Sequence, residues 1–283
     1  MERDLGSLLE KQNHRMEQES YIIRGGEEGR ERLKVLSRVM RARTLSLLNQ
    51  TGIRRGMDCL EVGCGSGDLA FDLARIVGAG GRVVATDIDE VKLELARREA
   101  EQQQLTNLEF RLADIVDNES EQFDFAHARF VLTHLQNPQK ALEKMRRTIR
   151  PGGILVVQDI DFRGHFCHPE CAAFSRYIEL YTQTAWRRGA DPNIGPRLPG
   201  LLTKAGLEAV QMNVVQSAAM SGEVKLMAPL TMENIADAVL AEGLAVRVEL
   251  DRIVDELYEF ARDPETVVGG PRVVQAWGYR PRS

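Results

Sequence analysis

The sequence predicts an α/β fold built on a Rossmann-like, doubly wound parallel sheet with helices on both faces. Two observations lead to this prediction. Short strands of the buried type alternate with helical segments between residues 58 and 161, and such alternation specifies a parallel sheet. The first strand also runs directly into Gly63, Gly65 and Gly67, at the position where open α/β sheets bind their ligands.

The elements of this sheet follow one another closely along the chain. The predicted strands are 58–62, 82–86, 108–112, 123–127 and 154–158, and the predicted helices are 68–77, 90–104 and 139–149. The strands are short and apolar, whereas the helices repeat apolar residues every three to four positions. A turn at Pro151-Gly152-Gly153 separates the last helix from the fifth strand.

The alternation is interrupted after Asp161. The remaining predicted elements are a helix at 171–188 with an aromatic stripe (Phe174, Tyr177, Tyr181), short elements at 201–205 and 210–215, a helix at 231–262 and a strand at 273–277. We therefore expect four parts, namely an N-terminal lid segment at 1–30, a cofactor-binding core at 31–165, a cap over the substrate at 166–200, and a segment that completes the core at 201–283, with a helical insertion at about 221–262.

The composition excludes several classes of protein. The 37 Lys and Arg against 42 Asp and Glu give a net charge of -5, so we expect no nucleic-acid partner. No apolar run is long enough for a membrane span, and the 4 cysteines are too few and too irregular for a disulfide scaffold. Because residues 1–20 contain no apolar leader, we expect a cytoplasmic protein. We expect it to be a monomer or a homodimer.

The residues around the glycines indicate which nucleotide is bound. Asp68 stands where a dinucleotide fingerprint has its third glycine, and its charge disfavours a pyrophosphate. Asp87, which closes the second strand, can accept both hydroxyls of a ribose, although such an acid is also a common helix cap. Asp114 can accept from an adenine amino group beside the N–H of Ile115, and Glu61 can hold the loop or receive an ammonium through water. The set predicts an adenosine without phosphates.

These segments together resemble the class I S-adenosylmethionine-dependent methyltransferases. Leu60–Ala70 is similar to motif I of that family, Ala85–Asp89 to motif II, and Leu112–Ile115 to the adenine-binding motif. Residues 123–129 and 137–153 resemble the small-molecule branch that includes the ubiquinone- and menaquinone-type enzymes, like methyltransferases of types 11 and 25.

The resemblance implies S-adenosyl-L-methionine as cofactor and S-adenosyl-L-homocysteine as product. It also implies a seven-stranded methyltransferase sheet with an N-terminal helical lid and helical insertions after the fifth and sixth strands. The expected cofactor contacts are Glu61, Gly63, Cys64, Gly65, Gly67, Asp87, Ile88, Ala113, Asp114, Ile115, Ala128 and Arg129, with Tyr21 and Arg32 closing over the amino-acid end. Cys64 is equally explained as a small loop residue, and Arg129 by a substrate anion or a surface salt bridge.

His134 is the candidate catalytic base, because the exit of the fourth strand faces the methyl group in this fold. A helix-start or packing role for His134 is the alternative, and His127 is expected to be an ordinary strand histidine. The cluster His165, Cys167, His168 and Cys171 fits no common zinc spacing, so we expect no metal.

The function predicted from these residues is methyl transfer to a small-molecule acceptor by in-line displacement. A nucleic-acid or protein methyltransferase of the same fold is one alternative, although His127-Ala128-Arg129 lacks the Asn/Asp-Pro-Pro-Tyr run of enzymes that methylate base amino groups. A non-catalytic S-adenosylmethionine-binding protein is the other. The acceptor itself is not readable from the sequence.

Overall fold

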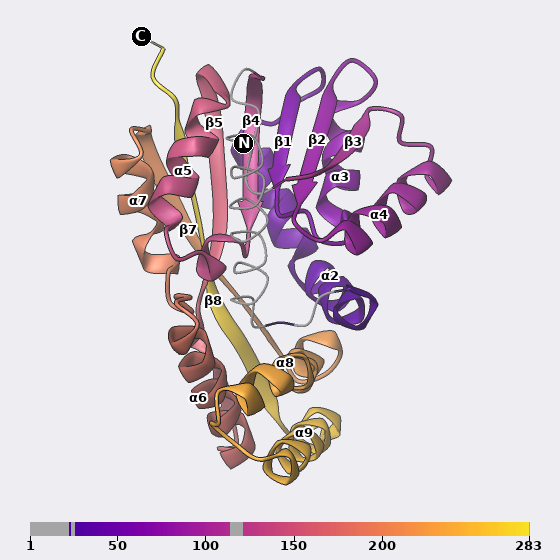
Figure 1. The fold of residues 1–283 in the computed structure, drawn as a ribbon, viewed down its shortest axis with the longest axis vertical. Coiled ribbons are helices and arrows are strands. Elements are labelled where there is room, and N and C mark those ends of the chain that lie inside the picture. Colours follow the sequence, from indigo (N-terminus) through magenta and orange to yellow (C-terminus); the bar gives the residue numbers. More distant parts are fainter. Residues whose placement is uncertain (1–22, 24–25, 114–120, 283) are drawn as a thin grey trace, which may run out of the picture.

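The computed structural model describes residues 23, 26–113 and 121–282, and its centre is a mixed sheet in the order β3-β2-β1-β4-β5-β8-β6, with β7 also paired to β8 (Figure 1). The strands are β1 Asp58–Val62, β2 Arg82–Asp87, β3 Leu108–Leu112, β4 Phe123–Arg129, β5 Ile149–Asp161, β6 Phe166–His168, β7 Glu208–Ala219 and β8 Val267–Tyr279. Strands β1 to β5 are parallel, and β8 runs antiparallel to β5, β6 and β7. The predicted fold class is confirmed. The predicted count of seven strands is wrong, because β6 adds an eighth by pairing with the start of β8.

The helices are α2 Gly26–Gln50, α3 Asp68–Val77, α4 Glu90–Gln102, α5 Pro138–Arg147, α6 Ala172–Arg187, α7 Leu198–Lys204, α8 Glu223–Ala241 and α9 Arg247–Arg262, with short helices η1 Leu132–His134, η2 Phe162–Gly164 and η3 Gly195–Arg197. Successive residues of β1 show how the sheet is covered. Cys59 packs with α3 and the end of α2, and Leu60 packs on the other face with α5 and α7. A strand buried on both faces is typical of a parallel sheet.

Three helices of the insertions gather at one end of the molecule, beyond the carboxyl ends of β1 to β4 (Figure 1). Here α6, α8 and α9 share one core, which includes Phe174, Met232 and Leu250. The expected single helix over 231–262 is wrong: α8 begins at Glu223 and ends at Ala241, and the chain turns back through Gly243, which has φ +63. Two antiparallel-packed helices can bury apolar faces against each other, which one continuous helix could not.

Helix α2 joins the sheet to this insertion. Its last turns are anchored by Leu47 and Leu48, which are fully buried against the sheet. Nearer its start, Arg32 and Arg38 hydrogen-bond to residues of α8. Most of the expected lid at 1–30 lies outside the described residues, so this lid and the four expected domain boundaries stay predictions. Among the helices of the described ranges, none has the length and apolarity to cross a membrane.

Candidate active site

The glycine loop between β1 and α3 has a backbone that only glycine adopts easily. Gly63, Gly65 and Gly67 have φ values of +69, +55 and +82, in the left-handed region that disfavours other residues. A Cβ on Gly63 would collide with Val131 Cγ2, and one on Gly67 would lie 3.1 Å from the Ala96 side chain. The loop is therefore held close to both the β4 exit and α4, and its open side faces a cavity.

Asp87, the last residue of β2, ties this loop to the start of α4. Its Oδ2 accepts from the N–H of Gly65 at 2.7 Å, and its Oδ1 accepts from the N–H of Asp89 at 3.0 Å. Each carboxylate oxygen keeps a further lone pair, and Asp87 lines the cavity together with Ile88 and Ala113. The carboxylate is thus positioned before any ligand binds, with capacity left to accept from hydroxyl groups.

Glu61 is a buried acid on the cavity wall. The residue is 4% exposed, and within the described part of the chain its Oε2 has no hydrogen-bond partner. The pKa of its carboxyl is raised to about 8, mainly by burial; the charge of Arg129 lowers this pKa, and the charges of Asp68 and Asp87 raise it. A buried carboxyl oxygen that faces a cavity without a partner is suited to receive a cation, because a bound cation favours the ionised form.

Arg129, at the end of β4, is held by a chain of buried polar groups. It donates to Thr44 Oγ1 at 3.1 Å, and the Thr44 hydroxyl lies 3.4 Å from Gln158 Oε1. Gln158 in turn lies 2.8 Å from the Nε2 of His127 and accepts from Gln275 at 2.8 Å. Burial lowers the pKa of His127 to about 3, so this histidine is neutral. Its expected position in a strand is confirmed, but among the described residues its buried Nδ1 has no hydrogen-bond partner. Among the described carboxylates, none pairs with Arg129, so its guanidinium can serve a ligand.

The other expected cofactor residues differ in their relation to the cavity. Cys64 lines it and is buried, with its N–H bonded to the carbonyl of Thr86. Gly67 and Ala128 are buried beside the cavity but are not among the residues that line it. Tyr21, Asp114 and Ile115 lie outside the described residues, so their roles stay predictions.

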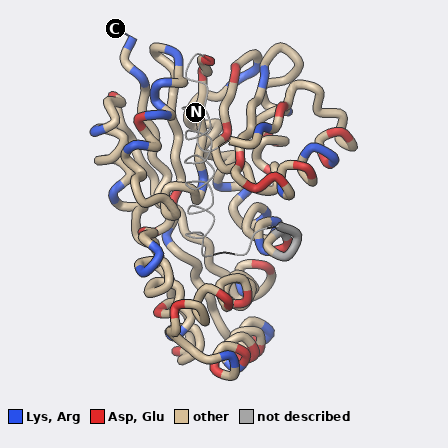
Figure 2. Tube along the Cα trace, in the orientation of Figure 1, with Lys and Arg blue, Asp and Glu red and all other residues tan. Residues whose placement is uncertain are grey.

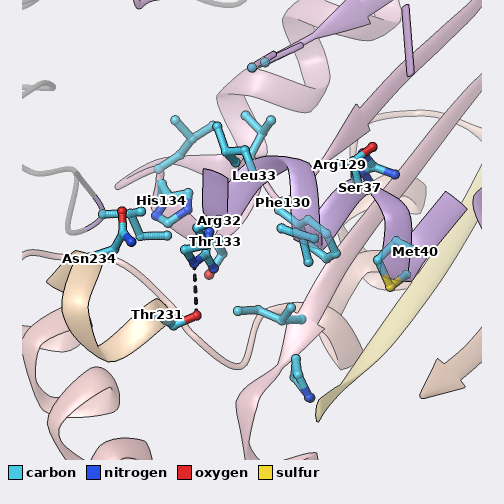
Figure 3. A pocket seen from close by; sticks show the side chains of 18 of the residues that line it. Arg32, Leu33, Ser37, Met40, Arg129, Phe130, Thr133, His134, Thr231 and Asn234 are labelled. Atoms are coloured by element: carbon cyan, nitrogen blue, oxygen red, sulfur yellow. Dashed lines mark hydrogen bonds between the residues drawn. The ribbon is translucent and has the colours of Figure 1, made fainter. Parts of the chain in front are cut away.

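The cavity has a volume of about 1130 Å³, and its wall includes both the glycine loop and a group of apolar side chains far from it in sequence. Figure 3 shows part of this wall from close by. We call the part of the cavity lined by these apolar side chains the apolar chamber. Its apolar lining is Leu36, Met40, Phe130, Ile160, Phe162, Tyr177, Tyr181, Met227 and Val273. These side chains come from α2, the β4 and β5 exits, η2, α6, α8 and β8, so distant parts of the chain meet around one volume.

Stacked rings form one wall of the apolar chamber. Phe162 and Tyr181 are parallel, with centroids 4.0 Å apart and planes at 10°, and Tyr177 meets Phe162 edge-on at 5.7 Å. His165 packs on Phe162 at 4.2 Å, and burial lowers its pKa to about 4. His165 therefore belongs to this wall. Within the described ranges, no three His, Cys, Asp or Glu side chains are grouped so that they could hold a metal.

His134 ends η1 on the wall of the cavity, near Arg32 and Thr133 (Figure 3). Asp159 fixes this short helix, because its carboxylate accepts from the N–H of Thr133 at 3.0 Å. Burial lowers the pKa of His134 to about 3, and the charges of Arg32 and Lys92 contribute. His134 is consequently neutral at pH 7 and is a weak base in the resting protein.

Several polar residues of the cavity were not singled out from the sequence, and Thr231 and Asn234 are two of them. Thr231 and Asn234 lie one turn apart on α8, and Thr231 accepts a hydrogen bond from Arg32 Nε at 3.0 Å (Figure 3). Polar residues within a helix are ordinary, and the contact joins residues 199 apart in sequence. No local pattern signals such a contact.

Comparison with known proteins points to one family. Residues 53–191 match the family described as a methyltransferase domain. A ubiquinone/menaquinone biosynthesis C-methyltransferase of Marinomonas sp. is 30% identical over 138 residues, which is 48% of this chain and 53% of that protein. The chain spans about half the length of the curated relatives that it matches.

Solved structures share the fold at low sequence identity. A candidate methyltransferase from Bacillus halodurans has a TM-score of 0.58 at 19% identity, over 84% of this chain and 98% of that one. The cyclase SpnF has a TM-score of 0.53 at 19% identity, over 85% and 80%. At such identities the likeness establishes the fold alone.

Proposed function

The chain belongs to the class I S-adenosylmethionine-dependent methyltransferases, and we propose on this premise that it transfers a methyl group from S-adenosylmethionine to a small-molecule acceptor. The observation that carries the proposal is the single cavity that joins the glycine loop to the apolar chamber. A methyltransferase needs these two spaces to be continuous, because the acceptor atom and the methyl carbon must come into line.

The residues on the glycine-loop side fit the cofactor. Glu61 offers a buried oxygen to the ammonium of its methionine portion, and Arg129 offers a guanidinium to the carboxylate. Asp87 offers its remaining lone pairs to the ribose hydroxyls. The proposed further contacts are Gly63, Cys64, Gly65, Ile88 and Ala113 on the cavity wall, with Gly67 and Ala128 in support, and Asp114, Ile115 and Tyr21 from the part not described.

When bound, S-adenosylmethionine supplies an electrophilic methyl group on a sulfonium. The protein's part is to orient the acceptor and to exclude water from the cavity. His134 lines the cavity and can accept a proton from the acceptor, but with a pKa of about 3 it does so weakly. The proposed activity therefore suits an acceptor that is already acidic.

The shape and charge of the molecule favour a small acceptor over a macromolecule. Acidic and basic residues alternate along the described chain (Figure 2), whereas a nucleic-acid groove concentrates Lys and Arg. The apolar chamber is lined mainly by aromatic and aliphatic side chains, which is typical of small-molecule sites.

The test has two stages. S-adenosylhomocysteine at millimolar concentration should raise the melting temperature of the purified protein by mass action. Incubation of the protein with S-adenosylmethionine and a library of apolar small molecules should then release S-adenosylhomocysteine with at least one of them. A folded protein whose melting temperature does not respond would contradict the proposal. Binding without turnover across the library would instead indicate a cofactor-binding protein with another role.

A further inference from the structure

One buried cation faces the apolar chamber. Arg32, on α2, is 8% exposed and lines the cavity. Its Nε donates to the hydroxyl of Thr231, which is a neutral partner. Among the described residues, no carboxylate lies within 4.0 Å of its guanidinium. The remaining N–H donors of the guanidinium are thus available to a ligand.

Two other cations along the cavity have carboxylate partners, whereas Arg129 on the glycine-loop side, like Arg32, is bonded to a threonine hydroxyl. Lys92 pairs with Asp89 at 3.3 Å, and Arg188 pairs with Glu242 at 3.0 Å. A buried charge is expensive unless it is paired and hydrogen-bonded. Lys92 and Arg188 thus have carboxylate partners, whereas the partner of Arg32 within the described part of the chain is the Thr231 hydroxyl. An anion brought by the ligand would complete this arrangement.

The surroundings of Arg32 are suited to recognition of an oxygen atom. The Tyr177 hydroxyl and the His134 ring both lie close enough for the charge of Arg32 to act on them. Asn234, one turn after Thr231, has a buried Oδ1 with no partner among the described residues. These groups form a small polar patch within walls that are otherwise aromatic and aliphatic. A ligand that fills the apolar chamber can therefore place one polar group against this patch.

The cofactor's own carboxylate is the competing source of an anion. Arg129 lies near Glu61, on the glycine-loop side. Arg32 lies with His134 and Thr231 instead, and Figure 3 shows the two arginines on separate parts of the cavity wall. The expectation that Arg32 closes over the amino-acid end of the cofactor is therefore less well supported than a role toward the acceptor.

We propose that Arg32, fixed by Thr231, binds an anionic oxygen of the acceptor, so that the substrate is an apolar, ring-bearing molecule that carries a carboxylate or an ionised enol or phenol. This inference rests on the proposed function, since it assigns the apolar chamber to the acceptor. Recognition in a low-dielectric chamber makes the pairing strong and directional. Arg32 also orients the acceptor relative to His134, which lies on the same part of the wall.

The test uses a charged probe and its neutral analogue. With S-adenosylhomocysteine present at saturation, the affinities of 2-naphthoate and 2-naphthamide for the full chain are measured by isothermal titration calorimetry. The wild-type protein should bind the carboxylate at least about tenfold more tightly than the amide, as a charge-assisted pair requires. Arg32→Met should remove this preference while the affinities for the amide and for S-adenosylhomocysteine change less than about twofold.

Arg38→Met is the matched control. Arg38 lies on the same helix and also reaches α8, where its Nε donates to Glu223 at 2.7 Å, but its side chain is 50% exposed. This variant should keep the preference for the carboxylate. Arg32→Lys, which keeps the charge but loses the planar fork, should retain part of the preference and serves if Arg32→Met does not fold.

Three results would overturn the inference. The wild-type protein with bound S-adenosylhomocysteine could take both probes equally, or neither at millimolar concentration. Arg32→Met could weaken S-adenosylhomocysteine binding and leave the carboxylate preference intact, which would assign Arg32 to the cofactor. A wild-type protein that fails to bind S-adenosylhomocysteine at all would refute the proposed function itself, and the preliminary titration detects that separately.

Discussion

The two ends of the cavity are built in different ways. The glycine-loop side comes from the exits of neighbouring strands, with its groups between Glu61 and Arg129. The apolar chamber takes side chains from α2, η2, α6, α8 and β8, among others, which are spread from Leu36 to Val273. One end is dictated by the sheet, and the other depends on how helices pack beyond it.

This difference has a physical origin. At the glycine loop, backbone groups carry much of the site: Asp87 accepts from the N–H groups of Gly65 and Asp89. The parallel register of β1 and β2 brings those groups together whatever the surrounding side chains are. In the apolar chamber the groups are side chains, such as Phe162 and Tyr181. The shape of the chamber depends on how these side chains pack against one another. We expect the first end to tolerate little change and the second to be adjustable.

The largest effect should follow Gly63→Ala. A Cβ there would collide with Val131, and the residue has φ +69, so the loop or the β4 exit must move. The Kd for S-adenosylhomocysteine, measured by calorimetry, should rise by about 100-fold, equivalent to roughly 2.7 kcal/mol.

Gly52→Ala is the control, because Gly52 has φ +79 and nothing lies within 4 Å of the added Cβ. It should lose stability by about 1 kcal/mol through backbone strain and bind normally. Equal binding by both variants would contradict the proposed loop geometry.

The second prediction uses the protonation of Glu61. The pKa of Glu61 is about 8 in the folded protein and about 4.3 in the unfolded chain. Between these two pH values the carboxyl is therefore protonated in the folded protein and ionised in the unfolded chain. Its effect on stability is absent below pH 4 and becomes more unfavourable as the pH rises toward 8. Glu61→Gln should therefore be more stable than wild type at pH 8, by about 2 to 4 kcal/mol in urea unfolding, and no more stable at pH 4.

The same variant should fail to bind the cofactor well, since it cannot ionise toward an ammonium. Wild-type protein should release a proton on binding S-adenosylhomocysteine at pH 6.5, detected by calorimetry in buffers of different ionisation enthalpy. The Glu61→Gln variant should show less release. A stability difference that is flat from pH 4 to pH 8 would argue that Glu61 is not the buried acid inferred here.

The same contrast explains what the sequence could reveal. Strands β1 and β3 and helix α3 begin and end where the pattern predicts, because apolar periodicity and strand-exit glycines are local signals. Glu61 and Asp87 were found for the same reason, since each lies at a strand exit. Gly243, with φ +63 just after the end of α8, is a local signal for a helix end that the prediction passed over in favour of the helical pattern on both sides. The three-residue strand β6 has no strong local signal, because it depends on pairing with the distant β8.

The polar patch of the apolar chamber could not be predicted from the sequence. Arg32 was singled out for a role at the cofactor, which stays a prediction, and nothing near it in sequence reveals Thr231 as its partner. Tyr177 and Tyr181 were recognised as one face of a helix, and a packing role and a lining role were equally open for them. The structure brings both onto the cavity wall. Only the pairing of α2 with α8 gives these residues a common site.

The third prediction concerns that wall and should have a moderate effect. Tyr181→Leu removes the ring that stacks on Phe162 at 4.0 Å, a contact worth about 1 kcal/mol. Binding of 2-naphthoate in the presence of S-adenosylhomocysteine should weaken by about fivefold. Binding of S-adenosylhomocysteine itself should not change, because its site lies at the other end of the cavity. Tyr181→Phe keeps the ring and should bind both like wild type. An equal loss of both ligands in Tyr181→Leu would mean that the two ends are not separable.

The smallest effect should come from Thr44→Val, which tests whether the buried polar chain serves Arg129. The hydroxyl of Thr44 accepts from Arg129 at 3.1 Å, and the residue is 1% exposed, so the nearly isosteric valine fills the same space. Gln158 keeps its bonds to Gln275 and His127, and the sheet should therefore remain intact. Loss of one hydrogen bond of about 1 kcal/mol should raise the Kd for S-adenosylhomocysteine by about two- to fivefold.

Thr203→Val is the control. It removes an exposed hydroxyl on α7 that donates to the Pro199 carbonyl, and it should have no effect on binding. If Thr44→Val also binds like wild type, Arg129 is positioned by its contact with Phe130 instead, and the buried polar chain contributes nothing to the cofactor end of the cavity.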